Sequence, residues 1–237
     1  MHTRHLIREG EGVGKMEELW DTAARAEAMG FDHVWVGDAP RLSLLDRAHA
    51  DCLTIMAALS AKTRRVRIGT VPLIAALRNP VLLAHALATL DVISGGRVII
   101  GVSVAPQYKY AEREFQACGV LFHQRAGRLN ESVHVMRRLW TEEAFAFEGK
   151  YYRFEAIGIE PKPIQKPIPI WVAAGDNENA LKSAALRRDT MTLFIAFIVE
   201  DDGSVVWSGP ELLREIDARK NAAIGEKTSA AKASSSR

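Results

Sequence analysis

Four groups of small and polar residues in this 237-residue sequence follow segments that are predicted to be buried strands. Ligands of parallel α/β proteins bind at the carboxyl ends of the strands, so these groups are the candidates for a binding site. Asp38 is the best placed carboxylate for catalysis, and its alternative role is to cap the loop at Pro40. The other groups are Thr70, Val71 and Pro72; Ser103, Val104 and Ala105; and Gly175, Asp176 and Asn177.

The last of these groups has the local chemistry of a phosphate site. Gly175 ends a strand, and a helix is predicted to start near Glu178. Unpaired backbone N–H groups and the positive end of the helix dipole would then face outward, which suits a phosphate. A plain turn capped by Asp176 or Asn177 explains the same residues equally well, so both interpretations stay open.

The Val71–Pro72 peptide bond follows directly on a buried strand. In the cis form it would push a backbone bulge into the mouth of the site. Only about 5–6% of X–Pro bonds are cis, so the two residues by themselves favour the trans form.

Other catalytic chemistries find little support in the sequence. The run Gly10–Gly14 resembles a dinucleotide-binding turn, but Lys15 takes the place of its third glycine, and a flexible loop is the better interpretation. The seven histidines show no metal-ligand spacing, and Cys52 and Cys118 form no CxxC pair, so we expect no metal. The sequence has neither a GxSxG elbow nor a GxxxxGKS/T phosphate loop.

Several charged residues are expected to be solvated rather than functional. Arg125, Arg128 and Glu131 lie on one predicted helix, with Arg128 and Glu131 spaced i,i+3, where we expect a solvated or inter-element ion pair. Glu112 and Glu114 are expected to be surface charges.

The composition is that of an ordinary globular domain. Hydrophobic residues make up 48% of the chain, and the net charge of only +2 argues against a nucleic-acid partner. No apolar run approaches the roughly 20 residues that cross a bilayer, and the N-terminus lacks the apolar stretch of a signal peptide. We therefore expect no association with a membrane. Because Cys52 and Cys118 cannot form a disulfide framework, a reducing cytoplasm is the expected compartment.

Strands and helices are predicted to alternate along the chain, about 30 residues apart. Such units imply a parallel sheet with crossover helices, either an open doubly wound sheet or a (β/α)8 barrel. One domain, residues 1–224, and a disordered polar tail, residues 225–237, are expected. The expected helices are 15–29, 51–61, 80–93 and 125–140; the strands are 31–38, 66–70, 98–102 and 170–174, after a weak strand at 4–9; a hairpin spans 145–154.

Six motifs, in this order along the chain, resemble the luciferase-like monooxygenase superfamily. The S-G-G-R before a strand and the R-x-x-R-L-x-E helix are together hard to obtain by chance. The resemblance extends roughly from Leu19 to Arg188. The motifs are AEAMGFDHVWVGD (26–38), TRRVRIGT (63–70), LRNPVLLAHALATLDVISGGRVIIGV (77–102), EREFQACGV (112–120), RAGRLNESVHVMRRLW (125–140) and IPIWVAAG (168–175).

This resemblance implies a (β/α)8 barrel of the TIM type that binds reduced FMN or the deazaflavin coenzyme F420. In such proteins the ring of the cofactor leans on a backbone bulge after the third strand, often made by a cis bond. The bulge matches Val71–Pro72, so the resemblance favours a cis bond there. The loop that matches Ser103–Ala105 lines the cofactor pocket, and the glycine that matches Ala174–Gly175 helps to hold a phosphate.

Two departures from the family pattern bear on function. Many relatives, particularly those that use F420, carry Asp-His at the end of the second strand, whereas this chain has Asp38 followed by Ala39. Beyond Arg188 the match fades, so we expect a barrel that is incomplete at its C-terminal end.

The resemblance implies a flavin-dependent oxidoreductase. We expect a monooxygenase that uses reduced FMN and dioxygen on a small organic substrate, with a flavin reductase as a further partner. An F420-dependent hydride-transfer enzyme and a truncated, non-catalytic flavin-binding protein are the alternatives. Because an incomplete barrel exposes sheet edges and apolar faces, we also expect a homodimer.

Overall fold

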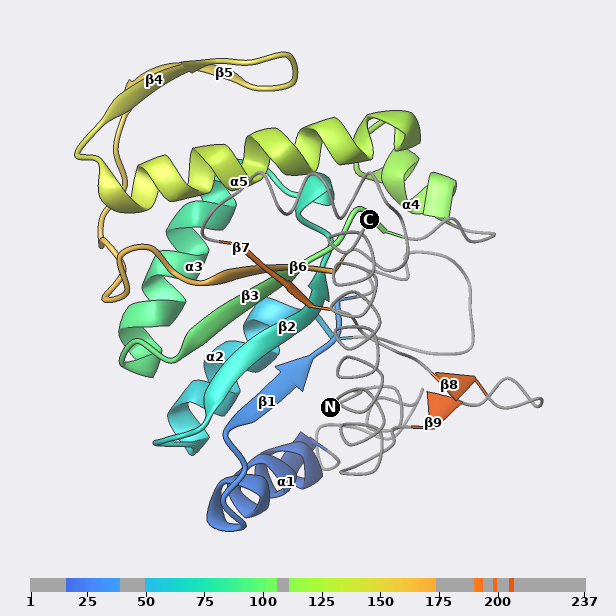
Figure 1. The fold of residues 1–237 in the computed structure, drawn as a ribbon, viewed down its shortest axis with the longest axis vertical. Helices are drawn as coiled ribbons and strands as arrows, with labels where there is room; N and C mark the ends of the chain where they lie inside the picture. Colours follow the sequence, from blue (N-terminus) through green and yellow to red (C-terminus); the bar gives the residue numbers. More distant parts are fainter. Residues whose placement is uncertain are drawn as a thin grey trace, which may run out of the picture. The chain divides into compact units, whose positions relative to one another are not determined.

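Five parallel strands form one sheet, in which they lie in the same order as along the chain (Figure 1). A doubly wound sheet reverses its strand order at a switch point, whereas a barrel of the TIM type does not, so this order is that of a barrel wall. The strands within the described residues do not close into a complete barrel. The five strands are β1 (His33–Val36), β2 (Arg67–Leu73), β3 (Val98–Val102), β6 (Ile170–Ala173) and β7 (Thr190–Leu193).

The computed structural model describes residues 16–38, 50–105, 111–173, 190–193, 198–199 and 205–206. The chain divides into two compact units, residues 1–194, which contain the five-stranded sheet, and residues 195–237. The second unit contains a two-stranded antiparallel ladder of β8 (Ile198–Val199) and β9 (Val205–Val206). The predicted strand at 4–9, the helix near Glu178 and the boundary at 224 lie outside the described residues. Among the helices that are described, none has the length and apolarity to cross a membrane.

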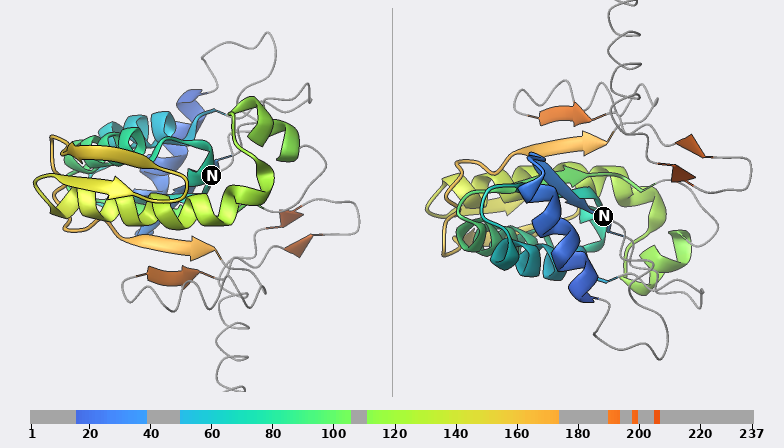
Figure 2. Two further views of the ribbon diagram at one scale, coloured as in Figure 1. Left: turned by 90° about the horizontal axis from the view of Figure 1, so that it is seen from above. Right: turned by 90° about the horizontal axis from the view of Figure 1, so that it is seen from below.

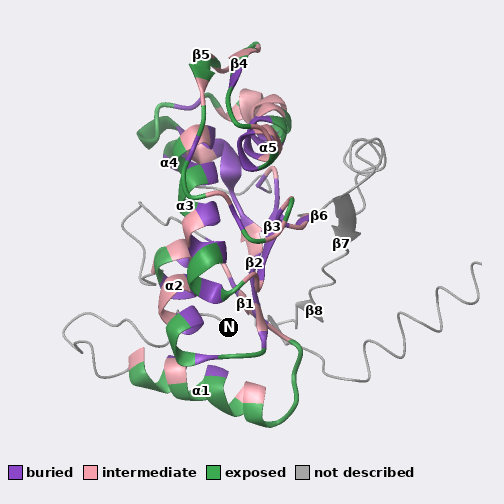
Figure 3. Ribbon diagram, turned by 90° about the vertical axis from the view of Figure 1, so that its left-hand side faces the viewer, coloured by how far each residue is buried: buried purple, intermediate pink, exposed green. Residues whose placement is uncertain are grey.

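Helices cover one face of the strands β1 to β3, and the buried residues lie between the two layers (Figure 3). In α1 the buried residues are Leu19 and Ala23, as the spacing of the apolar residues predicts. The indole Nε1 of Trp140 donates a hydrogen bond to the carbonyl oxygen of Ala84 at 3.0 Å and so joins α5 to α3. The helices are α1 (Met16–Ala28), α2 (Cys52–Lys62), α3 (Pro80–Ser94), α4 (Ala111–Ala117) and α5 (Arg125–Thr141), with 3-10 turns η3 (Ala75–Leu77) and η4 (Phe122–Gln124).

The starts of two helices are fixed by side-chain caps. The Asp51 carboxylate accepts a hydrogen bond from the backbone N–H of Thr54 at the start of α2. The Asn79 side chain accepts from the N–H groups of Val81 and Leu82 at the start of α3. These caps satisfy backbone donors that have no partner inside the helix, and they set where each helix leaves the carboxyl edge of the sheet.

At the amino edge of the sheet, Arg97 of the S-G-G-R motif joins three segments. All five of its side-chain N–H donors are used, since the guanidinium donates to Ser94 O, Thr63 Oγ1, Val66 O, Ser60 O and Thr63 O. The motif therefore has a structural role at the edge opposite to the candidate site.

A hairpin of β4 (Phe145–Glu148) and β5 (Arg153–Ile157) lies alongside α5 (Figures 1 and 2). Glu131 holds its turn, because the carboxylate accepts hydrogen bonds from the backbone N–H groups of Lys150, Tyr151 and Tyr152. Arg128 instead lies over the rings of Tyr151 and Tyr152 and donates to Gln124 Oε1. The predicted Arg128–Glu131 ion pair is therefore wrong, because the Glu131 carboxylate is instead occupied by the backbone N–H groups of the turn, which have no other partner within the described residues.

Candidate functional site

The carboxyl ends of β1, β2 and β3 meet at one edge of the sheet. Val36 pairs with Thr70 of β2, and Leu73 of β2 pairs with Val102 of β3. Asp38, the Thr70–Pro72 group and the Ser103–Ala105 group therefore lie around one edge, as predicted. β6 is parallel to β3 and ends at the same edge, but Ala174, Gly175, Asp176 and Asn177 lie outside the described residues.

A β-bulge interrupts the pairing of β2 with β3 between Thr70 and Leu73. Thr70 pairs with Ile100 and Leu73 with Val102, so Val71 and Pro72 together oppose Gly101 alone. Gly101 lies so close to β2 that a Cβ on it would be 2.3 Å from the carbonyl oxygen of Thr70. Thr70 and Leu73 are fully buried, whereas Val71 and Pro72 are only half-buried, so the bulge presents an apolar surface at the edge of the site.

The expected cis bond at Val71–Pro72 is wrong. The cis peptide bonds within the described residues are Glu160–Pro161 and Lys166–Pro167, both in the segment before β6. The backbone protrudes at Val71–Pro72 because two residues oppose one, and this does not require a cis bond. The predicted bulge itself is confirmed.

The loop after β3 turns sharply away from the sheet. Ser103 is bound to β2 through its backbone N–H, which donates to the carbonyl oxygen of Leu73. Its hydroxyl oxygen accepts a hydrogen bond from the N–H of Ala105 at 3.1 Å. Ala105 has a φ of 65°, a left-handed conformation that is unusual for a residue other than glycine. Val104 is half-buried between them, so this loop leaves one apolar side chain at the rim.

Asp38 is buried and both of its carboxylate oxygens are engaged. Oδ2 accepts a hydrogen bond from the backbone N–H of Ile74 at 3.1 Å, and Oδ1 accepts one from the Arg78 guanidinium at 3.0 Å. The Asp38 side chain is only 3% exposed, compared with 26% for Arg78. A carboxylate held in this way is poorly placed to exchange protons with a substrate, so its contacts favour a structural role over that of a catalytic base.

Sequence reasoning missed the partners of Asp38. Arg78 also donates to Asp51 Oδ2 at 2.9 Å and so joins the end of β1 to the start of α2. The Cys52 thiol is buried beside them, where burial raises its pKa well above the usual range and the charge of Asp38 raises it further, so the thiol stays protonated. The sequence offered one signal for these contacts, namely that Arg78, a cation, lies two residues before Pro80, where α3 starts.

A small apolar cluster lies beside the bulge and the loop after β3. Ile74 and Ala105 pack there against Phe115 of α4, and the rings of Phe115 and Phe122 meet edge to face at 5.2 Å. Glu114 on the same helix is 2% exposed, so the expectation that it is a surface charge is wrong, although Glu112 is exposed as expected. The short helix α4 turns its apolar face and Glu114 inward because it packs on the site loops.

The face of the sheet away from α1 to α3 carries a group of half-buried aromatic side chains. The rings of Trp35 on β1 and Trp171 on β6 lie 5.1 Å apart, and His33 stacks on Trp35 at 5.8 Å. Gly69 between them has no side chain, and a Cβ there would be 2.3 Å from the Trp35 ring. Burial lowers the pKa of His33, and the charge of Arg67 lowers it further. β1 and β6 are separated by β2 and β3, so these ring contacts fit a sheet that curves toward this face, as a barrel wall does.

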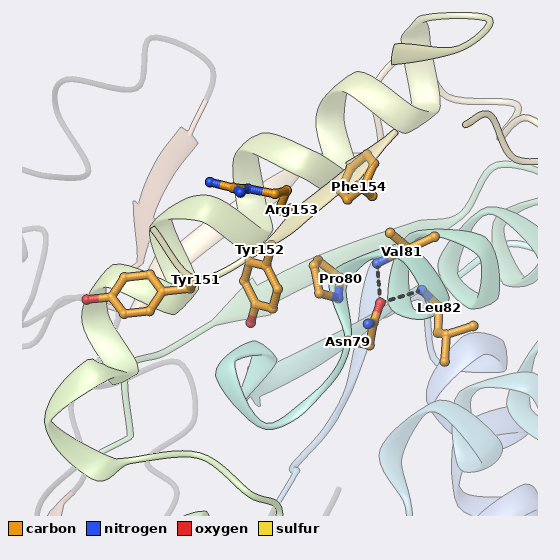
Figure 4. A pocket seen from close by; sticks show the side chains of 8 residues that line it. All are labelled: Asn79, Pro80, Val81, Leu82, Tyr151, Tyr152, Arg153 and Phe154. Carbon is orange, nitrogen blue, oxygen red and sulfur yellow. Dashed lines mark hydrogen bonds between the residues drawn. The ribbon is translucent and has the colours of Figure 1, made fainter. Parts of the chain in front are cut away.

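An open groove of about 500 Å³ lies between the start of α3 and the hairpin turn (Figure 4). Tyr151 and Tyr152 come from the hairpin side, and Asn79 and Leu82 from the helix. Of the predicted cofactor residues that the structure describes, none lines it. We therefore place the candidate site at the bulge and not in this groove.

Comparison with known proteins agrees with this geometry. The model of the luciferase-like monooxygenase family matches residues 2–209. The chain belongs to this family. The F420-dependent glucose-6-phosphate dehydrogenase of Intrasporangium calvum is 39% identical over 163 residues, which are 67% of this chain and 48% of that protein. The 237-residue chain thus spans about half the length of the curated relatives that it matches.

Solved structures of luciferase-like proteins show the same fold. The monooxygenase RslO1 from Streptomyces bottropensis superposes with a TM-score of 0.65 at 26% identity, over 81% of this chain and 68% of that one. An F420-dependent secondary alcohol dehydrogenase, solved with an F420–acetone adduct, gives a TM-score of 0.62 at 27% identity, over 76% of this chain and 55% of that one. The prediction of a TIM-barrel type of fold is confirmed.

Proposed function

We propose that this chain is the cofactor-binding part of an oxidoreductase that transfers a hydride between F420 and a small organic substrate. The observation that carries the proposal is the half-buried bulge of Val71 and Pro72 at the carboxyl edge, where the family resemblance puts the ring of the cofactor. Similarity to F420-dependent dehydrogenases at 37–39% identity favours the deazaflavin over FMN. This reverses the order of the two cofactors that the sequence motifs suggested.

The residues at this edge fit a flat ring with an anionic tail. Val71 and Pro72 offer an apolar surface, and Pro72 has no backbone N–H that would need a partner. Ser103 to Ala105 form the neighbouring wall. The cluster around Phe115 excludes water from the back of these loops. Gly175, Asp176 and Asn177 are the candidates for the phosphate. When bound, F420 supplies the hydride chemistry, while the protein orients the ring and its substrate.

A small phosphorylated sugar is the first substrate to test, because the relatives of this chain are glucose-6-phosphate dehydrogenases. The decisive experiment is a titration of the purified chain with F420 and with FMN, followed by fluorescence. We expect F420 to bind more tightly than FMN, and we expect the substrate to reduce F420 with no consumption of oxygen. Failure to bind either cofactor would refute the proposal.

One pair of variants tests the position of the ring. Val71→Asp places a charge on the bulge and should weaken cofactor binding at least about tenfold, because the carboxylate must be desolvated against the ring. Val92→Asp is the matched control, since Val92 lies on α3 and is 42% exposed. Equal affinity of the two variants would place the ring elsewhere.

A monooxygenase with reduced FMN is the second candidate. Ala39 stands where many F420 users have a histidine, and RslO1 is a monooxygenase. This alternative predicts FMN binding and substrate-dependent oxygen consumption, with a flavin reductase as partner. Cofactor binding with neither activity would indicate a non-catalytic relative. Sedimentation of the cofactor-bound chain tests the proposed homodimer.

A further inference from the structure

We propose that Arg78 is a positioning residue that acts through Asp38 to hold the Val71–Pro72 bulge in place. The inference rests on the proposed function in one respect, namely that the bulge supports the ring of the cofactor. The contacts that carry it are independent of any cofactor. They form a closed chain from the end of β1 to the turn that follows the bulge.

The Asp38 carboxylate ties together the two ends of the turn η3. Ile74 precedes η3 and Arg78 follows it. The Ile74 N–H donates to Oδ2 of Asp38, and the Arg78 side chain donates to Oδ1, so one carboxylate closes the turn. Ile74 comes two residues after Pro72, and Leu73 between them pairs with Val102. The bulge is thus held by the sheet on one side and by Asp38 on the other.

Arg78 is the cation that stabilises the buried carboxylate in this arrangement. An ionised carboxylate in an apolar setting needs a counter-charge and hydrogen bonds. The same Arg78 Nη2 also donates to Asp51, which caps α2 through Thr54 N, so the two hydrogen bonds of one guanidinium join the end of β1 and the start of α2 to the turn η3. Burial lowers the pKa of Arg78, but Asp38, the largest of the opposing influences, and the other neighbouring groups, Asp51 among them, together raise it overall, so the cation persists.

The test compares Arg78→Met with the double variant Asp38→Asn/Arg78→Met. Arg78→Met leaves the Asp38 charge buried without its cation, and should loosen its hold on Ile74. The double variant has no buried charge, and the amide oxygen introduced at position 38 still accepts from the Ile74 N–H. Arg138→Met is the control, because Arg138 is also a half-buried partner of a carboxylate, Glu142, but lies at the far end of α5.

Two measurements are made on each variant. Hydrogen exchange of the Ile74 amide should be at least about tenfold faster in Arg78→Met than in the wild type and in Arg138→Met. The dissociation constant of F420 should rise about tenfold in Arg78→Met and return to within about threefold of the wild type in the double variant. A residue that only stabilised the fold would leave the dissociation constant of the folded protein for F420 unchanged in both variants.

The outcomes separate the inference from the proposed function. If the wild type binds cofactor but Arg78→Met changes neither affinity nor Ile74 exchange, the inference is wrong. Equal loss of affinity in the single and double variants would mean that Arg78 contacts the ligand directly, which also overturns it. If the wild type binds no cofactor while Ile74 exchange rises in Arg78→Met, the proposed function fails and the hold on the turn stands.

Discussion

Replacing Glu131 by glutamine tests how the hairpin is fixed to α5. Oε1 of Glu131 accepts from Lys150 N at 2.8 Å, and Oε2 accepts from Tyr151 N at 2.9 Å and Tyr152 N at 3.1 Å. Glutamine has one acceptor oxygen, so in either orientation its amide group meets at least one backbone N–H donor. A hydrogen bond to a charged group contributes about 1.5–3 kcal/mol, and this turn is partly exposed, so we expect a loss of about 1.5 kcal/mol.

Thermal unfolding of Glu131→Gln and of a control variant, Glu155→Gln, measures this loss. For a protein of this size about 1.5 kcal/mol lowers Tm by about 3–6 °C. Glu155→Gln is the matched control, because Glu155 lies exposed on the same hairpin. Amide exchange at Lys150, Tyr151 and Tyr152 should rise in Glu131→Gln alone. Equal Tm values for the two variants would refute the assignment of Glu131 to the turn.

Three further predictions concern single positions. Ala105→Gly should change the free energy of unfolding little, because relief of the φ of 65°, about 0.5–1 kcal/mol, is offset by loss of a buried methyl group that packs with Phe115, about 0.8 kcal/mol; a Tm shift of more than about 3 °C would contradict this. Gly127→Ala should cost about 0–2 kcal/mol in a denaturant titration, because the clash of its Cβ, 2.4 Å from the Tyr151 ring, is partly offset by the roughly 1 kcal/mol by which alanine is favoured over glycine within a helix. Burial raises the pKa of Glu27, but hydrogen bonds from the N–H groups of Val66, Arg65 and Arg64 outweigh it and lower the pKa below 4.5. Its stabilising effect is therefore present above that pH and lost on acidification, and Glu27→Gln should flatten the decline of Tm below about pH 4.5.

The elements of the sheet could be predicted because their signals are local. The five buried residues of Val98–Val102 and the proline at the start of α3 identify strand and helix with bounds within a few residues of those observed. The bulge was predicted only through the family resemblance, because the number of residues that oppose each other depends on the register of two strands. The cis form that the resemblance favoured for the Val71–Pro72 bond was wrong. Register is a property of two paired strands, and the sequence of one strand does not determine it.

The partners of charged side chains were the least predictable part of the site. Asp38 was identified from its place after a strand, but its bonds to Ile74 and Arg78 join residues 36 and 40 positions apart. Glu131 was assigned to its helical neighbour, whereas its donors lie about 20 residues away in a turn. Spacing along a helix shows which neighbours are within reach, and only the packed structure shows which donors lack another partner.

The five bonds of Arg97 have a consequence for how this scaffold can change. They anchor three connections at the amino edge, away from the bulge, so the rigid base does not depend on the loops at the opposite rim. Substitutions in the loops at the carboxyl edge can therefore accumulate without breaking the contacts of Arg97 at the amino edge. A protein engineer seeking a new substrate range would keep Arg97 constant and randomise the rim.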